Sequence, residues 1–81
     1  MAFSLLIFSI DREIFVGQAN SLIAPGAVGE FQVLADHTPM ISLLKEGDIT
    51  IEDDSGKEQK LPIKGGVVEV TPKEVTALVS F

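Results

Sequence analysis

Residues 48–57 read Asp48-Ile49-Thr50-Ile51-Glu52-Asp53-Asp54-Ser55-Gly56-Lys57, and they form the clearest structural pattern in the sequence. Its first five residues alternate strictly between polar and apolar, which is typical of a β-strand with one buried face. Asp48 and Glu52 would then share the solvent face, opposite the two isoleucines. Gly56 can take the positive φ that a hairpin loop needs. The stretch therefore predicts a β-hairpin whose turn spans residues 53–57.

The segments on either side of this hairpin indicate further strands. Residues 66–71 and 74–80 are rich in valine and threonine, whose branched side chains suit a pleated surface. The turn Thr71-Pro72-Lys73 between them predicts a second hairpin. Residues 3–10 are apolar at both alternating positions, which indicates a strand that is central in the sheet or covered by something else.

Proline and glycine divide the rest of the chain. Pro62 cannot donate a hydrogen bond to a neighbouring strand, so we expect residues 60–64 to form an edge strand or to contain a bulge. Gly65-Gly66 indicates a kink or a close approach of two backbones. Turn signals recur roughly every 8 to 12 residues, and no segment has a convincing helical period. We therefore predict a single all-β domain over residues 1–81, built as a sandwich or barrel.

Composition and charge exclude several classes of protein. The 81 residues include 12 acidic and 6 basic side chains, for a net charge of −6, and no cysteine. This field repels phosphate backbones and the bases do not cluster, which argues against nucleic-acid binding. Without cysteine there is no disulfide framework and no thiolate metal site, so we expect a soluble protein of a reducing compartment. Residues 1–10 are apolar but far shorter than the ~20 residues of a spanning helix, and they lack the basic start of a signal peptide.

One acid–imidazole pair invites a catalytic interpretation. Asp36 is followed by His37, the sole histidine, and Thr38 and Ser42 are the nearby hydroxyl groups. The pair precedes Pro39, however, and that context favours a turn over a buried triad. We therefore interpret the histidine as a loop residue that caps backbone groups or faces a partner.

Two other patterns suggest a metal-binding and a phosphate-binding site, but the spacing of their residues does not match the known motifs. An acidic run suggests calcium, but its spacing differs from the EF-hand pattern and no flanking helices are expected. The run consists of Glu46, Asp48, Glu52, Asp53 and Asp54. Lys64-Gly65-Gly66 is too short for a phosphate-binding loop, and a valine-rich strand follows it where a helix would be needed. We predict no catalytic, cofactor-binding or metal-binding residues, so the residues alone indicate a small acidic β domain that binds something.

Three motifs in order resemble one known family, the epsilon subunit of F-type ATP synthases. Gly29-Glu30-Phe31-Gln32-Val33-Leu34-Ala35-Asp36-His37-Thr38-Pro39-Met40-Ile41 is similar to its G-E-hydrophobic…G-H-x-P-hydrophobic segment. Leu44-Lys45-Glu46-Gly47-Asp48-Ile49 resembles its L-K-x-G-x-I, and Gly65-Gly66-Val67-Val68-Glu69-Val70 resembles its G-G-hydrophobic-hydrophobic-E-V. Ser9 followed by Phe15-Val16-Gly17 resembles its opening. Together the motifs cover nearly the whole chain.

The resemblance implies both a fold and a role. It implies a flattened β-sandwich or barrel of about ten short, mostly antiparallel strands. It also implies a non-catalytic rotor subunit of the central stalk, which links the gamma subunit to the membrane c-ring and couples proton flow to ATP synthesis. By the same resemblance Gly29 and Glu30 would contact the c-ring. Ser9, His37 and Ser42 would lie along the side that faces gamma.

The sequence departs from the family in two places. Ala35-Asp36 stands where the family usually has proline and glycine before the histidine. We expect no C-terminal helical hairpin of the kind that usually follows this sandwich, since the sequence ends at Phe81, so no inhibitory or nucleotide-binding role is carried over. We expect a peripheral membrane protein on the cytoplasmic face of a bacterial inner membrane, or the plastid thylakoid equivalent. In isolation, an uncovered apolar surface could pair two copies of the chain. The alternative is a β-barrel module that binds a small ligand.

Overall fold

The computed structural model describes residues 1–81, which form eight β-strands and no helix. Their bounds are β1 Phe3–Phe8, β2 Glu13–Gly26, β3 Gly29–Val33, β4 Met40–Leu44, β5 Gly47–Asp53, β6 Glu58–Ile63, β7 Gly65–Val70 and β8 Glu74–Ser80. The predicted all-β architecture is confirmed. The strands number eight rather than about ten, because one long strand, β2, serves in both layers of the sandwich.

β2 is the strand that joins the two layers. Its first half pairs with β1, from Ala19 opposite Phe3 to Glu13 opposite Phe8. Its second half pairs with β5 on one side and with β3 on the other. A register shift between Ala19 and Ser21 lies where the strand changes layers, and a bulge of this kind bends and twists a strand.

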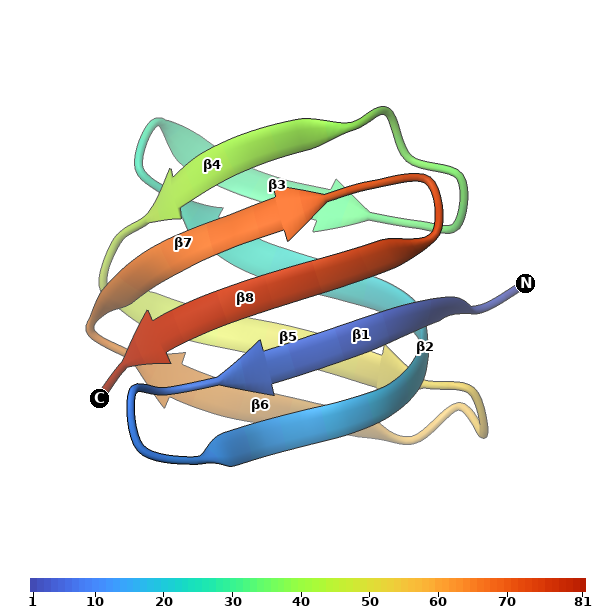
Figure 1. Cartoon of the computed structure of the whole chain (residues 1–81), viewed down its shortest axis with the longest axis horizontal. Helices are drawn as coiled ribbons and strands as arrows, with labels where there is room; N and C mark the ends of the chain where they lie inside the picture. The colour runs from blue at the N-terminus through green and yellow to red at the C-terminus, as the bar shows by residue number, and fades with distance from the viewer.

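The two layers differ in their strands and lie face to face. The front layer is the sequence β4-β7-β8-β1 completed by the first half of β2, and it faces the reader in Figure 1. The back layer is β6-β5 followed by the second half of β2 and β3. All pairings are antiparallel except that of β1 with β8. β1 is thus flanked on both sides by other strands, which confirms one of the two alternatives predicted for residues 3–10.

The core lies between the layers and is entirely apolar. Alternate positions of each strand point inward, so the periodicity of two in the sequence becomes one buried cluster. Its sixteen members are Phe3, Leu5, Ile7, Ala19, Leu22, Ala24, Val33, Leu44, Ile49, Ile51, Ile63, Val68, Val70, Val75, Ala77 and Val79. No polar or charged side chain is buried with them. The chain's own side chains therefore fill the interior. The alternative interpretation, a barrel that binds a small ligand, lacks the central cavity that it would need.

The predicted β5–β6 hairpin is confirmed with its turn. Asp53 Oδ1 accepts hydrogen bonds from the backbone N–H groups of Ser55 and Lys57, at 3.0 and 2.9 Å, and from the Ser55 hydroxyl at 2.7 Å. Gly56 has a φ of 89°, as the turn requires. β6, which contains Pro62, is the last strand of its sheet, as expected of a strand with a missing donor.

The predicted β7–β8 hairpin and the close approach at Gly65-Gly66 are confirmed too. Val70 pairs with Val75, and the Thr71 hydroxyl accepts from the Glu74 N–H at 3.0 Å to close the turn. A Cβ added at Gly66 would overlap the carbonyl oxygen of Leu78 and lie 3.0 Å from the Cα of Val79. Only glycine allows the two backbones to approach this closely.

Candidate protein-binding face

The outer side of the front layer is unusually apolar for a surface. In β4 the outward residues are apolar although they are uncovered: Leu44 points inward, whereas Ile41 and Leu43 are 71% and 67% exposed. The outward positions of β7, β8, β1 and the first half of β2 continue this surface across the sheet. We call the set the apolar face; its members are Leu6, Phe8, Val16, Ile41, Leu43, Val67 and Leu78.

The strand register arranges the apolar face in two adjacent rows. One row is apolar throughout and runs from Leu43 through Val67 and Leu78 to Phe8. The next row begins at Ile41 and ends at Leu6 and Val16, with Glu69 and Thr76 between them. The face looks along the shortest axis of a molecule that measures 29 × 23 × 19 Å, so it occupies the broad side seen in Figure 1.

The outer side of the back layer is polar by contrast. On β5, Asp48 and Thr50 point outward, while Ile49 and Ile51 are buried, as the sequence predicted. The other outward positions of this layer are mostly polar as well, among them Glu30, Gln32, Glu52, Glu58 and Lys60. One broad side of the sandwich is therefore suited to water and the other to a partner, since large exposed apolar patches mark interaction sites.

Shallow hollows line the apolar face. One of about 270 Å³ lies between Phe8, Ile41, Val67, Glu69, Thr76 and Leu78. A neighbouring hollow of about 310 Å³ shares Val67 and Leu78 and extends to Ile10, which is 96% exposed. Such open depressions can accept protruding side chains of a protein partner.

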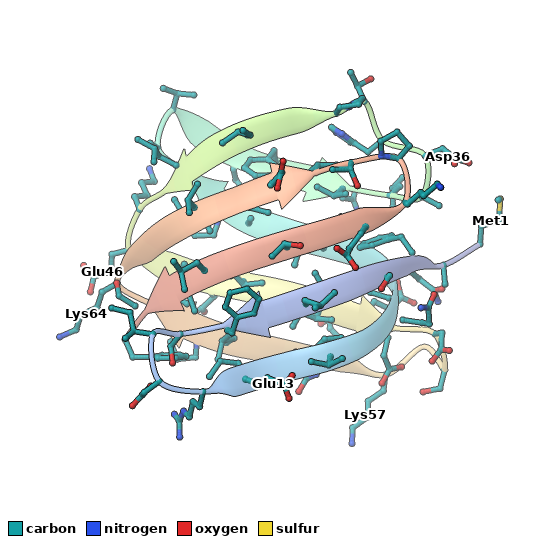
Figure 2. The ribbon with its side chains drawn as sticks, in the orientation of Figure 1. Met1, Glu13, Asp36, Glu46, Lys57 and Lys64 are labelled. Carbon is teal, nitrogen blue, oxygen red and sulfur yellow. The ribbon has the colours of Figure 1, made fainter.

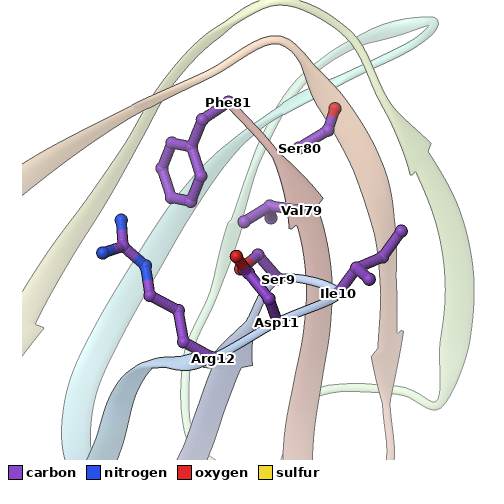
Figure 3. Close-up of a pocket in the computed structure, with 7 residues that line it drawn as sticks. All are labelled: Ser9, Ile10, Asp11, Arg12, Val79, Ser80 and Phe81. Carbon is purple, nitrogen blue, oxygen red and sulfur yellow. The ribbon is translucent and has the colours of Figure 1, made fainter.

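Ser9 lies in the turn after β1, at one end of the apolar face. Its hydroxyl donates to Asp11 Oδ1 at 2.9 Å, and its N–H donates to the carbonyl oxygen of Arg12 at 2.9 Å. Beside this turn is an open hollow of about 460 Å³ closed on one side by Phe81 (Figure 3). The Arg12 guanidinium carbon lies 5.9 Å from the centre of the Phe81 ring, within range of a cation–π contact.

His37 lies at the opposite end of the molecule from Ser9. It belongs to the loop between β3 and β4, on the side of Asp36 in Figure 2 and away from the end marked by Glu46 and Lys64. Its Nδ1 lies 2.7 Å from the carbonyl oxygen of Thr38, a local hydrogen bond rather than a bond to the neighbouring carboxylate. The structure thus agrees with a loop histidine and assembles no catalytic triad.

Asp36, where the sequence departs from the family's motif, has an unusual backbone conformation. It has a φ of 64°, the left-handed conformation that glycine adopts freely and aspartate tolerates. The N–H of His37 donates to the carbonyl oxygen of Leu34 at 3.2 Å and closes the turn. The aspartate therefore takes a conformation in which glycine would also fit.

Ser42 is in the middle of β4 but points away from the apolar face. It pairs with Val68, whose side chain is fully buried, so the serine faces the interior edge of the sandwich. Its hydroxyl donates to the carbonyl oxygen of Leu43 at 3.1 Å. Ser9, His37 and Ser42 are therefore spread along the length and edge of the front layer and do not meet.

Gly29 and Glu30 begin β3 at the same end of the molecule as Ser9. Gly29 pairs with Gly26, which in turn pairs with Leu44 at the end of β4. Glu30 is exposed on the outer side of the back layer, next to the fully exposed Val28 of the hairpin tip. Glu30 and the apolar face thus belong to two different surfaces.

Sequence reasoning missed most of the apolar face. It identified residues 3–10 as apolar on both sides, but overlooked the same signal in Met40–Leu44, where four of five residues are apolar. In Gly65–Val70 the outward Val67 carries the signal beside two buried valines. Strands that lack a polar alternation, although one of their sides is uncovered, are the sign of such a face.

The remaining chemistry of the surface is sparse. No group of three or more histidine, aspartate or glutamate side chains is arranged to hold a metal ion. The Ser55 hydroxyl and the Lys57 and Ser55 backbone donors lower the pKa of Asp53, a turn residue. The structure contains no helix of the length and hydropathy needed to cross a membrane.

Sequence comparison identifies relatives over almost the whole chain. The family described as "ATP synthase, Delta/Epsilon chain, beta-sandwich domain" matches residues 2–80. The ATP synthase epsilon chain of Psychrobacter sp. (strain PRwf-1) is 46% identical over 72 residues, which cover 89% of this chain and 52% of the relative. That of Nitrosococcus oceani is 42% identical over 72 residues, covering 89% of this chain and 51% of the relative. The chain thus spans about half the length of these relatives.

Solved structures share the fold at lower identity. A chain in the Euglena gracilis mitochondrial ATP synthase, in a structure of OSCP, F1 and c-ring, superposes with a TM-score of 0.92. It is 23% identical, with 99% of this chain and 51% of that chain covered. A chain of the Tetrahymena thermophila mitochondrial enzyme, from a structure of central stalk and c-ring, gives 0.79 at 14% identity, covering 100% and 65%. The sequence matches show the family, and the solved structures show the fold. The chain therefore belongs to the delta/epsilon chains of ATP synthase and corresponds to their β-sandwich domain.

Proposed function

We propose that this chain is a rotor subunit of the central stalk of an F-type ATP synthase. In this role it holds the gamma subunit to the membrane c-ring and so couples proton flow to ATP synthesis, without performing chemistry itself. It would then be peripheral to the membrane through the complex, on the cytoplasmic face of a bacterial inner membrane or the plastid thylakoid equivalent. The observation that supports this role most directly is the apolar face.

The apolar face fits a permanent partner better than a transient one. One of its two rows is apolar throughout and the other is apolar at both ends, and obligate interfaces are more apolar than the rest of a protein surface. We assign this face to the gamma subunit. Ser9 and His37 lie at its two ends, which supports their placement near a gamma interface. Ser42 lies in the edge strand β4 with its side chain turned away from the face, so it would meet gamma only at this edge.

Glu30 suits a different partner. It is exposed at the start of β3, on the outer side of the back layer and at one end of the molecule, away from the apolar face. We assign Gly29 and Glu30 to the loops of the c-ring, where an exposed carboxylate would pair with basic side chains and set the orientation more than the affinity.

Binding of the gamma subunit from the same genome tests this function. The chain and the separately expressed gamma subunit are mixed, and the complex is sized and its Kd measured; sizing of the chain alone records any self-association through the uncovered face. We expect a one-to-one complex. Leu78→Asp should weaken it at least about tenfold, because a carboxylate would replace an apolar side chain at the interface.

Gln32→Asp is the matched control. Gln32 is exposed on β3 in the back layer, so the same added charge should leave the Kd unchanged. If a folded gamma subunit forms no complex with the wild-type chain, the proposed function is wrong. If it binds Leu78→Asp as tightly as wild type, gamma uses another surface.

A further inference from the structure

One carboxylate stands inside the otherwise apolar surface of the front layer. Glu69 points outward from β7, with Ile41 opposite it on β4 and Thr76 opposite it on β8. Val67 precedes it on the same side of the strand. Glu69 also lines two adjoining hollows, the one of about 270 Å³ described above and one of about 380 Å³ that reaches Pro39 and Thr71.

The chain itself offers Glu69 no partner. None of the side-chain hydrogen bonds of the structure involves Glu69. No lysine or arginine occupies an outward position of the five strand segments that form the front layer. The carboxylate is exposed, so water satisfies it as long as the face is uncovered.

A partner that covers the apolar face must also remove this water. An ionised carboxylate that loses water without gaining a partner is strongly unfavourable, whereas one that meets a cation or hydrogen-bond donors is tolerated or favourable. A wholly apolar partner surface would therefore bind this face poorly. The need to pair this carboxylate therefore discriminates between partners. A partner without a suitable group leaves the charge unpaired, and such unpaired charges contribute to specificity as much as favourable contacts do.

We propose that Glu69 is the specificity-determining residue of the apolar face and pairs with a lysine or arginine of the gamma subunit. In the complex, apolar side chains of the gamma subunit on either side of this basic group would fill the hollows around Ile41 and Leu78. Arginine suits the position best, since its planar guanidinium can bind both carboxylate oxygens while packing against apolar neighbours. This inference rests on the proposed function and adds the chemistry by which the partner is selected.

Two substitutions of Glu69 test the pairing in the complex with the gamma subunit. Glu69→Gln keeps the shape and removes the charge, and we expect its Kd to rise about tenfold to a hundredfold because the partner's cation is left without its counter-charge. Glu69→Lys should weaken binding further through like-charge repulsion. Because Glu69 is exposed in the free chain, both variants should fold with an unchanged Tm.

Glu74→Gln and Glu74→Lys are the matched controls. Glu74 is also exposed and points outward from the front layer, but it lies at the start of β8, next to Ser4 and outside the apolar rows. Its variants change the net charge equally and should shift the Kd by no more than about threefold, as expected of a rim charge. Repeating the titrations at about 0.5 M salt separates the two sites, because a covered pair is screened much less than an exposed one.

The outcomes distinguish this inference from the proposed function. If Leu78→Asp weakens binding and Glu69→Gln does not, gamma covers the face but no cation meets Glu69, and the inference is overturned. A loss for Glu69→Gln that disappears at high salt, or that Glu74→Gln reproduces, also overturns it. If the wild-type chain fails to bind folded gamma, the proposed function fails and this inference with it.

Discussion

At the scale of the residue, Gly66 is a position where a single added methyl group would overlap the backbone of the neighbouring strand. Its added Cβ would meet the backbone of Leu78 and Val79 on the neighbouring strand, and backbone atoms cannot move aside as a flexible side chain can. We expect Gly66→Ala to lower the free energy of unfolding by about 1–3 kcal/mol, the range of overpacking substitutions. Urea unfolding followed by circular dichroism measures the change.

Gly65→Ala is the control next to it. Its Cβ would lie 3.4 Å from the carbonyl oxygen of Leu44, a contact that a small shift relieves, and its φ is ordinary. We expect a change clearly smaller than that of Gly66→Ala. Equal effects for the two glycines would show that the strand tolerates a wider spacing at Gly66 than the structure indicates.

At the scale of the element, the β5–β6 hairpin depends on the charge of one turn residue. Asp53 accepts three hydrogen bonds within its own turn, and these lower its pKa from the ordinary value of 3.8. A folded-state pKa below the unfolded one means that the carboxylate stabilises the fold fully above about pH 4 to 5 and loses this effect as the pH falls through its folded pKa.

Asp53→Asn isolates this contribution. We expect the wild type to have a Tm a few degrees higher than the variant at pH 7, and this difference to shrink below pH 4. Scanning calorimetry at several pH values measures it, and all other carboxylates cancel between the two proteins. Asp54→Asn is the control, since the side chain of Asp54 accepts none of the turn's hydrogen bonds. A Tm difference for Asp53→Asn that does not depend on pH would contradict the argument.

Some strands could be predicted from the sequence and others could not, depending on whether the same side of the strand is buried along its length. In the middle of β5, Ile49 and Ile51 are buried on one side and Asp48 and Thr50 lie on the other, so the alternation in its sequence predicts both that it is a strand and which side faces the core. β2 passes from one layer to the other at its bulge, and its inward side changes with it. No single period of two then describes Glu13–Gly26, and this strand was not predicted.

The candidate site was predictable in outline and not in detail. The family resemblance predicted Glu30 and Ser9 as contact residues from their positions in its motifs. The side to which a residue points could not be predicted in this way, because it depends on strand register, which is set by contacts distant in the sequence. Ser42 illustrates this, because its place in β4 turns it inward while Ile41 and Leu43 turn outward. The apolar face joins residues of five strand segments, so no local motif describes it.

At the scale of the whole molecule, the sandwich separates the two surfaces that we propose for two different partners. The apolar face occupies a broad side, whereas Glu30 lies at the end of the molecule that also carries Val28 and the turn after β1. Both surfaces can therefore be occupied at once, as a joint between a stalk and a ring requires. A rigid double layer between them transmits force, since its strands are tied by 40 backbone hydrogen bonds and no polar side chain is buried in its core.

This separation predicts opposite effects for substitutions at the two surfaces. In reconstitution of the chain and gamma on a purified c-ring, we expect Glu30→Lys to weaken ring binding on the order of tenfold, more so at low salt, and to leave the Kd for gamma unchanged. Leu78→Asp should weaken gamma binding directly. It should reduce ring binding only if the chain needs bound gamma to stay on the ring. Gln32→Asp, on the same side of the back layer as Glu30 but nearer its middle, should change neither. If Glu30→Lys and Leu78→Asp affect both partners equally, the two surfaces act as one and the assignment of Glu30 to the ring is wrong, because independent contacts on a rigid body lose affinity separately.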